Sequence, residues 1–316
     1  MDIGSGIIIG AGISITPPPP PSYKAIFGYG STTNESVKYS ITNLVSNTGV
    51  VATDTAGVGT ARLGLAAAGY GTDKAIFGYG NLGGYTAITN LVSNTGVVGN
   101  DVTGVGTARN FVAAAGYGTD KAIFGYGYAN PGVVSITNLV SNTGVVAGDT
   151  TGVGTSRYWL ASAGYGSTGQ AIFGYGHIPF SSPVSTTNLV SNTGVVASDT
   201  TGVGTGRMGI AAANYGTDKA LFGYGTTDGG NTGSLSITNL VSNTGIVATN
   251  TTGVGTARYG LAASSYGVDT AIFGYGSVST ASSITNLVSN TGVVATDTAG
   301  VGTARQSLAA ASYGLS

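Results

Sequence analysis

The chain of 316 residues contains no cysteine, a single histidine and few charged side chains. Without cysteine the protein can form neither disulfides nor thiolate metal sites, and one histidine excludes metal sites built from several histidines. Only 7% of the residues are charged, and the formal net charge is −1. A surface that binds nucleic acid or an anionic membrane would need clustered basic residues. We therefore expect no nucleic-acid partner and no metal or other cofactor.

Long apolar runs are also absent. No stretch of 18 consecutive apolar residues occurs, and a membrane-spanning helix needs about that length. The N-terminal residues lack the basic region and the long apolar core of a signal peptide. We expect a soluble protein, made without a Sec signal, that does not insert into a membrane.

The chain does contain a sixfold repeat. The string AIFGYG occurs five times and ALFGYG once, and the phenylalanines are separated by 50, 47, 49, 49 and 51 residues. A period of this size is typical of propeller blades and solenoid coils. Residues 22–316 are therefore expected to form one domain, preceded by an arm of residues 1–21. The phenylalanines are Phe27, Phe77, Phe124, Phe173, Phe222 and Phe273.

Each unit predicts four short strands. In one unit the apolar segments are Leu63–Tyr70, Lys74–Tyr79, Ile88–Ser93 and Val97–Asp101. The Asn-Thr-Gly string before the last segment fits a three-residue hairpin turn with glycine in the left-handed conformation. No segment shows a helical period. Every unit is therefore expected to be four antiparallel strands.

Four strands in about 49 residues predict an all-β fold, a six-bladed β-propeller of four-stranded antiparallel blades. The chain starts with a second strand, Lys24–Tyr29, and finishes with a first strand, Leu308–Tyr313. One blade would combine strands from both termini, which closes the ring and leaves no open edge. A β-solenoid is the alternative, but solenoids need atypical capping units, and the first and last units here are not atypical.

Two recurring strings resemble those of kelch repeats, in which a glycine pair ends the second strand and an arginine precedes the first strand of the next blade. Here FGYG stands at the first position, and Thr60-Ala61-Arg62 and its copies stand at the second. The resemblance covers nearly all of residues 23–316 and implies a propeller. The kelch tryptophan is missing from every unit, so kelch-type cellular partners do not follow.

The repeated arginines each follow an acidic or amide residue by eight positions. A ring of guanidinium groups could bind an anion in a central channel, or each pair could staple the scaffold. Recurrence of both partners in every unit favours structural pairs. The pairs are Asp54 and Arg62, Asp101 and Arg109, Asp149 and Arg157, Asp199 and Arg207, and Asp297 and Arg305, with Asn250 in the acidic position before Arg258.

The repeats differ mainly at two places: the loop between the second and third strands, and the two residues after each arginine. In an up-and-down blade both places lie at one end, opposite the near-constant NTG and YGTD turns. Variation confined to one face of a repeat scaffold is typical of a binding surface. The predicted binding face contains Phe111, Tyr128, Tyr158, Trp159, His177, Phe180, Met208 and Tyr259.

The sequence carries no recognisable catalytic motif. The glycine-rich strings GVGTAR and GYGTDK do not open a helix, as a phosphate-binding loop would. No loop concentrates enough carboxylates for a dedicated calcium site. His177 has no nucleophile motif near it, and Glu35 and Asp228 are only scattered acid/base candidates. We expect a protein that is not an enzyme.

The arm of residues 1–21 belongs to no unit. It carries three consecutive isoleucines, Ile7, Ile8 and Ile9, followed by Pro17–Pro21. A proline run forms a stiff polyproline II spacer, and three isoleucines favour burial. We expect the arm to anchor the domain to a partner, for example by adding a strand to a sheet edge.

This arm and the near-identical neutral repeats resemble structural proteins of marine or cyanobacterial tailed phages. The resemblance implies a component of the virion, either a head or tail decoration or a fibre tip, within an oligomeric assembly. Other virion proteins would bind residues 1–21, and the variable face would meet a host surface, for example a glycan on it. A free glycan-binding lectin is the alternative, which predicts saccharide binding without the arm.

Overall fold

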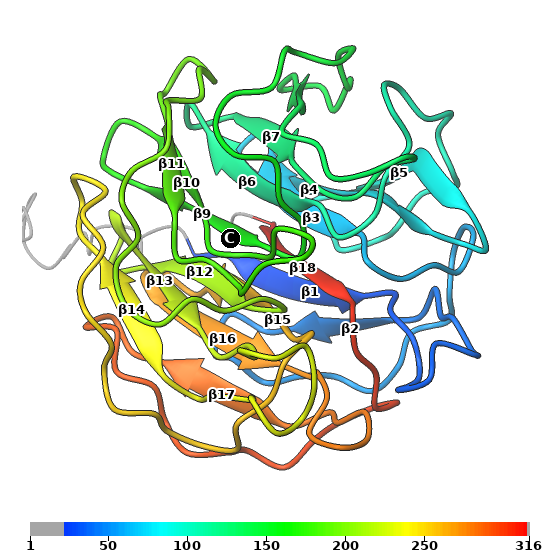
Figure 1. The fold of residues 1–316 in the computed structure, drawn as a ribbon. Coiled ribbons are helices and arrows are strands. Elements are labelled where there is room, and N and C mark those ends of the chain that lie inside the picture. The colour runs from blue at the N-terminus through cyan, green and yellow to red at the C-terminus, as the bar shows by residue number, and fades with distance from the viewer. Residues whose placement is uncertain (1–21, 315–316) are drawn as a thin grey trace, which may run out of the picture.

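The computed structural model describes residues 22–314, and in this range the protein is all-β, without helices. Eighteen strands form six antiparallel sheets of three strands each. The sheets are arranged around a common axis (Figure 1). The strands are β1 (Lys24–Gly28), β2 (Thr42–Val45), β3 (Ala66–Tyr70), β4 (Lys74–Asn81), β5 (Tyr85–Val92), β6 (Ala113–Tyr117), β7 (Lys121–Gly125), β8 (Thr137–Val140), β9 (Ala161–Tyr165), β10 (Gln170–Gly174), β11 (Thr187–Val190), β12 (Ala211–Tyr215), β13 (Lys219–Gly223), β14 (Thr238–Val241), β15 (Ala262–Tyr266), β16 (Thr270–Gly274), β17 (Thr285–Val288) and β18 (Ala309–Tyr313).

The inner strand of each sheet contacts the inner strands of its two neighbours. The contacts run in the order β3, β6, β9, β12, β15 and β18, and β18 contacts β3 again. These strands are rich in alanine, as in Ala66-Ala67-Ala68. Small side chains are required there because six strands approach one axis. The arrangement is compatible with a β-propeller.

Strands from opposite ends of the chain share one sheet. β1 pairs antiparallel with β18, from Lys24 opposite Tyr313 to Gly28 opposite Ala309, and β2 lies on its other side. The other five sheets are each built from consecutive strands. The sequence predicted this pairing of the first and last strands.

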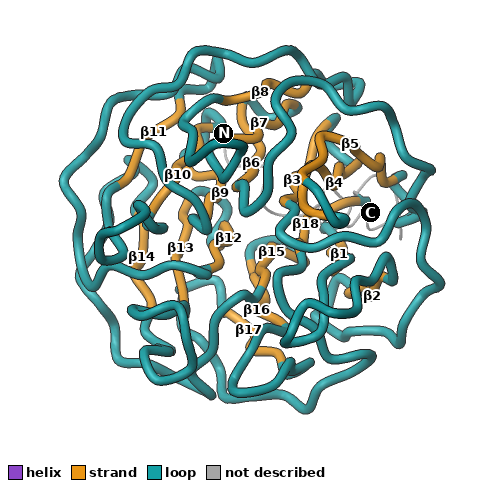
Figure 2. Tube along the Cα trace, turned by 45° about the vertical axis from the view of Figure 1, so that its right-hand side comes forward, coloured by secondary structure: helices purple, strands orange, loops and turns teal. Residues whose placement is uncertain are grey.

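The expected fourth strand of each sheet is not confirmed. The segment predicted at Val97–Asp101 touches β5 only through isolated bridges, Val98 with Val92 and Val102 with Thr89. Between these two bridges the outer segment advances by four residues, from Val98 to Val102, whereas β5 spans only three, from Thr89 to Val92. The outer segment therefore contains one extra residue, which interrupts the hydrogen-bond ladder. The Asn90 side chain fills the interruption, because its Nδ2 donates to the Gly99 carbonyl at 3.0 Å. Figure 2 accordingly shows loops around the outside of the strands.

The core lies between neighbouring sheets and is repeated six times. Ala25, Ile26 and Phe27 of β1, like their copies, are completely buried. The first glycine of FGYG makes this packing possible, since a Cβ atom on Gly28 would lie 2.7 Å from Cζ of Phe77 in the next sheet. Each glycine therefore leaves room for the phenylalanine of its neighbour.

Removing the last strand tests the role of the β1–β18 pairing. Deletion of Leu308–Ser316 would leave β1 without its inner partner and break the contacts of β18 with β3 and β15. We expect loss of the cooperative transition in thermal unfolding followed by circular dichroism. A truncated protein that melts like the full chain would contradict the prediction and favour a solenoid.

Candidate functional site

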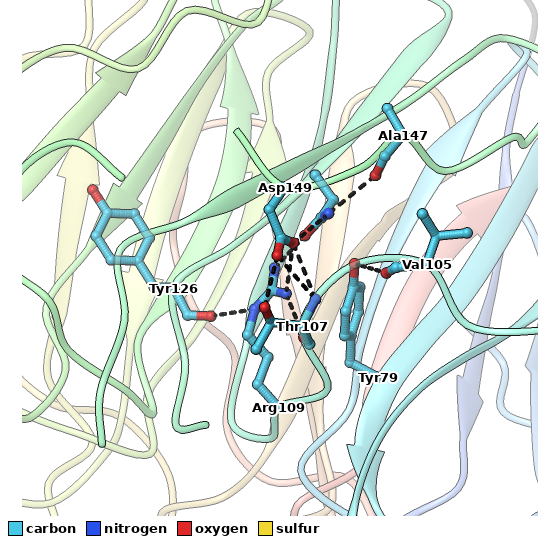
Figure 3. Close-up of polar contacts among 8 residues, drawn as sticks. Tyr79, Val105, Thr107, Arg109, Tyr126, Ala147 and Asp149 are labelled. Carbon is cyan, nitrogen blue, oxygen red and sulfur yellow. Dashed lines mark hydrogen bonds and ion pairs between the residues drawn. The ribbon is translucent and has the colours of Figure 1, made fainter. Parts of the chain in front are cut away.

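Each repeated arginine is completely buried, and Figure 3 shows the polar contacts of one of them, Arg109. Its Nε donates to the carbonyl of Tyr126 at 2.8 Å, and Nη1 donates to that of Thr107 at 2.9 Å. Nη2 donates to Oδ1 of Asn138 at 2.7 Å. On its other side, Cζ lies 4.3 Å from the ring centroid of Tyr79, which belongs to the preceding sheet.

The same stack occurs at all six boundaries between sheets, with distances of 4.3 to 4.7 Å. Because every guanidinium group is buried and hydrogen-bonded, none is available to bind an anion in a channel. The arginines are therefore scaffold. The stacks are Arg62 on Tyr29, Arg109 on Tyr79, Arg157 on Tyr126, Arg207 on Tyr175, Arg258 on Tyr224 and Arg305 on Tyr275.

The acidic partner of each arginine differs from the sequence-based assignment. Asp149 lies 4.0 Å from Nη1 of Arg109, and Asp54 lies 3.8 Å from Nη1 of Arg305. Each aspartate lies in the outer segment of a sheet, beside the arginine that precedes the first strand of that same sheet. The chain crosses to the next sheet only after the aspartate, so the arginine eight residues later belongs to the next sheet. The assignment by eight-residue spacing is replaced by Asp54 with Arg305, Asp101 with Arg62, Asp149 with Arg109, Asp199 with Arg157, and Asp297 with Arg258.

These aspartates tie their sheet to the incoming chain by hydrogen bonds. Asp149 accepts from the Thr107 backbone N–H at 3.1 Å, from its Oγ1 at 2.7 Å and from Asn138 Nδ2 at 2.9 Å. Partial burial acts to raise the pKa of Asp149, but these hydrogen bonds and Arg109 outweigh it, so the pKa lies below its usual range. Asn250 keeps similar geometry, accepting from Thr205 N–H at 3.2 Å and donating to Thr205 Oγ1 at 2.9 Å.

Substitutions at Asp149 separate the hydrogen bonds from the charge. Asp149→Ala should destabilise the fold by about 1–3 kcal/mol, because it leaves partly buried donors unpaired. Asp149→Asn should cost less, since Asn250 already serves in one repeat. Urea unfolding at pH 7 measures both, and equal losses would contradict the prediction.

The same carboxylates predict a loss of stability in acid. Their pKa is lowered in the folded protein, so their contribution is complete above the unfolded value of about 3.9 and disappears as the pH falls through the folded value. Replacing all five by asparagine should flatten the dependence of the unfolding free energy on pH below about 4. If the unfolding free energy of the variant fell in acid as steeply as that of the wild type, the prediction would be wrong.

The two variable places of the repeat meet at one end of the sheets. The residue after each arginine forms a β-bridge with the first residue of the variable loop of the same sheet. The bridges join Leu63 with Asn81, Asn110 with Tyr128, Tyr158 with His177, Met208 with Thr226, Tyr259 with Ser277, and Gln306 with Ser31. The structure thus brings together both sets of residues predicted for one face.

The second residue after each arginine belongs to a closed cycle of backbone hydrogen bonds. Each N–H donates to the carbonyl of the equivalent residue in the preceding repeat, at 2.6 to 3.0 Å. All six residues have positive φ, between +49° and +63°. The cycle consists of Gly64, Phe111, Trp159, Gly209, Gly260 and Ser307.

Two large aromatic residues therefore occupy positions that suit glycine. Phe111 has φ +49° and Trp159 has φ +56°, a region in which bulky residues are outliers. Such strain costs on the order of 1–3 kcal/mol per residue and is concentrated at functional sites. The neighbouring glycines accommodate the rings, because a Cβ on Gly64 would lie 3.1 Å from the Phe111 ring and one on Gly209 3.3 Å from that of Trp159.

The aromatic side chains on this face are in continuous contact. Phe111 and Trp159 have ring centroids 4.9 Å apart, and Trp159 lies 5.8 Å from Tyr259. From Phe111 the contacts continue to Tyr158 at 6.1 Å and on to Tyr128 at 5.6 Å. We call this set, completed by two further contacts, the aromatic platform. Its members are Tyr85, Phe111, Tyr128, Tyr158, Trp159, His177 and Tyr259.

The structure sorts the eight predicted face residues into three groups. Six lie in the platform, and one of these, Tyr259, is itself buried at 9% exposure; Met208 is buried beside the platform at 6%. Phe180 is fully exposed, at 108% of its reference area, and takes part in no ring contact among residues 22–314. Tyr85 was not among the predicted residues. The signal for it was its position: an aromatic residue outside the repeated framework, in a variable loop.

His177 is held by its neighbours in one orientation. Its Nε2 lies 2.9 Å from the Ser181 carbonyl, which can only accept, so this nitrogen carries the proton. Nδ1 lies 3.1 Å from the Tyr158 hydroxyl and accepts from it. Burial raises the pKa of Tyr158, which keeps the hydroxyl protonated. The histidine thus positions Tyr158 within the platform.

The scattered acidic candidates do not form an acid/base pair with this histidine. Asp228 binds its own loop, accepting from Thr226 Oγ1 and the Gly230 N–H at 2.8 Å each and from Thr232 Oγ1. These hydrogen bonds lower its pKa to about 2. Glu35 is exposed in another loop. Within residues 22–314 no three potential metal ligands cluster, and no helix is present that could cross a membrane.

Comparison with protein-family models and with curated proteins gives no match for this chain.

The left-handed backbone predicts an unusual order of stability among substitutions. Trp159→Gly should be more stable than Trp159→Ala, by roughly 1–2 kcal/mol, because alanine retains a Cβ in the left-handed region. At the adjacent Tyr158, which is not left-handed, alanine should be the more stable replacement. Chemical denaturation of the four variants checks this. Alanine more stable than glycine at both positions would contradict the prediction.

Proposed function

We propose that this protein is a six-bladed β-propeller that acts as a recognition scaffold, without catalysis, and that its aromatic platform binds a saccharide on a cell surface. The cyclic contacts of the inner strands, the pairing of β1 with β18 and the cycle of backbone hydrogen bonds support a closed ring of blades. In this proposal the irregular outer segment takes the place of the fourth strand of each blade.

The observation that carries the binding role is the strained backbone of Phe111 and Trp159. The cycle accepts glycine in three repeats and serine in one, so folding alone does not require an aromatic residue there. Two adjacent repeats nevertheless hold large rings at a conformational cost. Such a cost is expected where the side chain has a task other than stability.

The chemistry of the platform fits a neutral sugar. Aromatic rings supply a large and rigid contact area with little loss of conformational entropy, and their faces can stack on the C–H face of a sugar ring. Tyrosine hydroxyls and the backbone of the surrounding loops offer hydrogen bonds to sugar hydroxyls. None of the seven platform residues is a lysine or an arginine, the arginines are buried elsewhere, and Lys38 is the one lysine in a variable loop.

We further propose that the protein belongs to a virion and faces a host surface, held to other virion proteins by residues 1–21. The anchor residues Ile7, Ile8 and Ile9 lie outside the described residues, and this part of the proposal is supported by the sequence alone. Ser22 accepts from Asn47 Nδ2 at 3.2 Å, at the end of the sheets that carries the NTG turns. An anchor there would leave the aromatic platform pointing outward.

Saccharide binding tests the proposal directly. The double variant Phe111→Gly, Trp159→Gly should lose binding to a glycan array and to host cells while keeping its fold. Thr95→Ala, in an NTG turn at the other end, serves as the matched control and should bind normally. Normal binding by the double variant, with loss in the control, would contradict the proposal.

The same assay separates the virion from a free lectin. A chain without residues 1–21 should still bind saccharide but should no longer enter the particle. If the arm proves irrelevant to assembly while saccharide binding persists, the free lectin is the better conclusion.

A further inference from the structure

The end of the sheets opposite the platform carries a ring of exposed aliphatic side chains. Each repeat places one such residue directly after its NTG turn. Five are valines with 65% of their area exposed, and the sixth is Ile246 with 70% exposed. We call them the aliphatic ring: Val50, Val97, Val145, Val195, Ile246 and Val293.

Hydrogen bonds place these turns beside the turns between the first two strands of each sheet. Asn142 donates to Asp120 at 3.1 Å, and Asn243 donates to Asp218 at 3.0 Å. Asn290 donates to Asp269 at 3.1 Å. The aliphatic ring therefore belongs to the face on which these constant turns lie, remote from the variable loops.

The aliphatic ring is built on rigid turns. The Val50 N–H donates to Ser46 Oγ at 3.1 Å, and the Ser46 N–H donates back to the Val50 carbonyl at 2.9 Å. The five copies repeat both bonds at the same distances. The turn itself also packs on the preceding sheet, since a Cβ on Gly49 would lie 2.7 Å from the Tyr266 ring. Six aliphatic groups are thus held at fixed, regularly repeated positions in water.

We propose that the aliphatic ring is the interface of a dimer in which two copies of this chain pack face to face. A second copy offers apolar groups at six matching positions by construction, because the same six exposed residues recur on it. A twofold contact between identical surfaces is the commonest form of self-association.

The charges on this face allow such a contact. Its turns contain four lysines and four aspartates, so their formal charges cancel. Three lysines already pair with the preceding aspartate, Lys74 with Asp73 at 2.8 Å, Lys121 with Asp120 at 2.6 Å and Lys219 with Asp218 at 3.5 Å. Two copies therefore meet without net repulsion. The remaining charges are Lys24 and Asp269.

This dimer is independent of saccharide binding. Covering the two constant faces leaves the two aromatic platforms on opposite outer faces, where each stays open to a ligand. Ser22 lies beside the NTG turn at Asn47, on the constant face.

Sedimentation of the full chain tests the proposal. The wild-type protein should sediment with twice the 30.9 kDa mass of one chain across a micromolar concentration range. Replacing all six residues of the aliphatic ring by threonine, which matches valine in shape, should give a monomer. The control Val37→Thr, Val102→Thr changes exposed valines away from this face and should remain dimeric.

Single cysteine variants keep the test decisive if the sixfold variant fails to fold. The chain has no cysteine, so Val145→Cys and its five equivalents each introduce the only thiol. A short bifunctional maleimide should cross-link at least one of them to a dimer, and it should not cross-link Val102→Cys. Absence of cross-linking at all six positions would overturn the proposal.

Three other results would overturn it. One is a wild-type chain that stays monomeric. Another is a dimer that survives the six threonines and dissociates when residues 1–21 are removed, which would assign assembly to the arm. The third is a monomer that binds neutral phospholipid vesicles through the aliphatic ring, which would make lipid the occupant of this face.

Discussion

The stack of a buried arginine on the tyrosine of the preceding sheet is the interaction on which this structure depends. The arginine donates its hydrogen bonds within its own sheet, to Tyr126, Thr107 and Asn138 in the case of Arg109, so only the flat face of the guanidinium meets the neighbour. The tyrosine hydroxyl donates to a carbonyl of the linker that joins the two sheets, Tyr79 to Val105 at 3.1 Å. One contact therefore fixes two sheets and their connection. A desolvated cation–π contact of this kind is worth about 2 kcal/mol or more, and burial keeps the tyrosine neutral by raising the pKa of Tyr126 to about 12.

Among the non-glycine residues with positive φ, two groups differ in how regularly they recur. The tyrosine of every FGYG string has positive φ, between +62° and +65°, and its ring is packed between an arginine and a phenylalanine of the next sheet, as Tyr29 is between Arg62 and Phe77. Because this strain recurs in all six repeats and supports the stack, it belongs to the scaffold. At the mouth of the axis, bulky residues are strained in only two of six repeats. The repeated scaffold does not require the strain at Phe111 and Trp159, because glycine or serine occupies the same position in the other four repeats.

Much of the fold could be predicted from periodicity, whereas the details of partner choice could not. The spacing of FGYG and the short apolar segments predicted six β units, and the strand order predicted that β1 pairs with β18. The eight-residue spacing between Asp149 and Arg157 predicted the wrong pair, because these two residues lie in neighbouring sheets. Asp149 instead lies beside Arg109 of its own sheet. The outer segment does not form a continuous fourth strand because it contains one extra residue opposite β5. The pattern of apolar residues in the sequence does not reveal such a bulge. The aromatic residues could be placed at one end from sequence, but the burial of Met208 beside that end depends on packing around the axis.

The low charge of the chain follows from how the repeat is built. Each unit uses its arginine inside a boundary between sheets, and its acidic residue accepts hydrogen bonds from the incoming chain, as Asp149 does from Thr107. Most lysines are neutralised by an adjacent aspartate. Few charges are then left to attract a partner over a long distance, so the saccharide binding that we propose would depend on shape, stacking and hydrogen bonds at short range. Such contacts are individually weak, and the six constant repeats would support them by holding the variable residues rigidly in place.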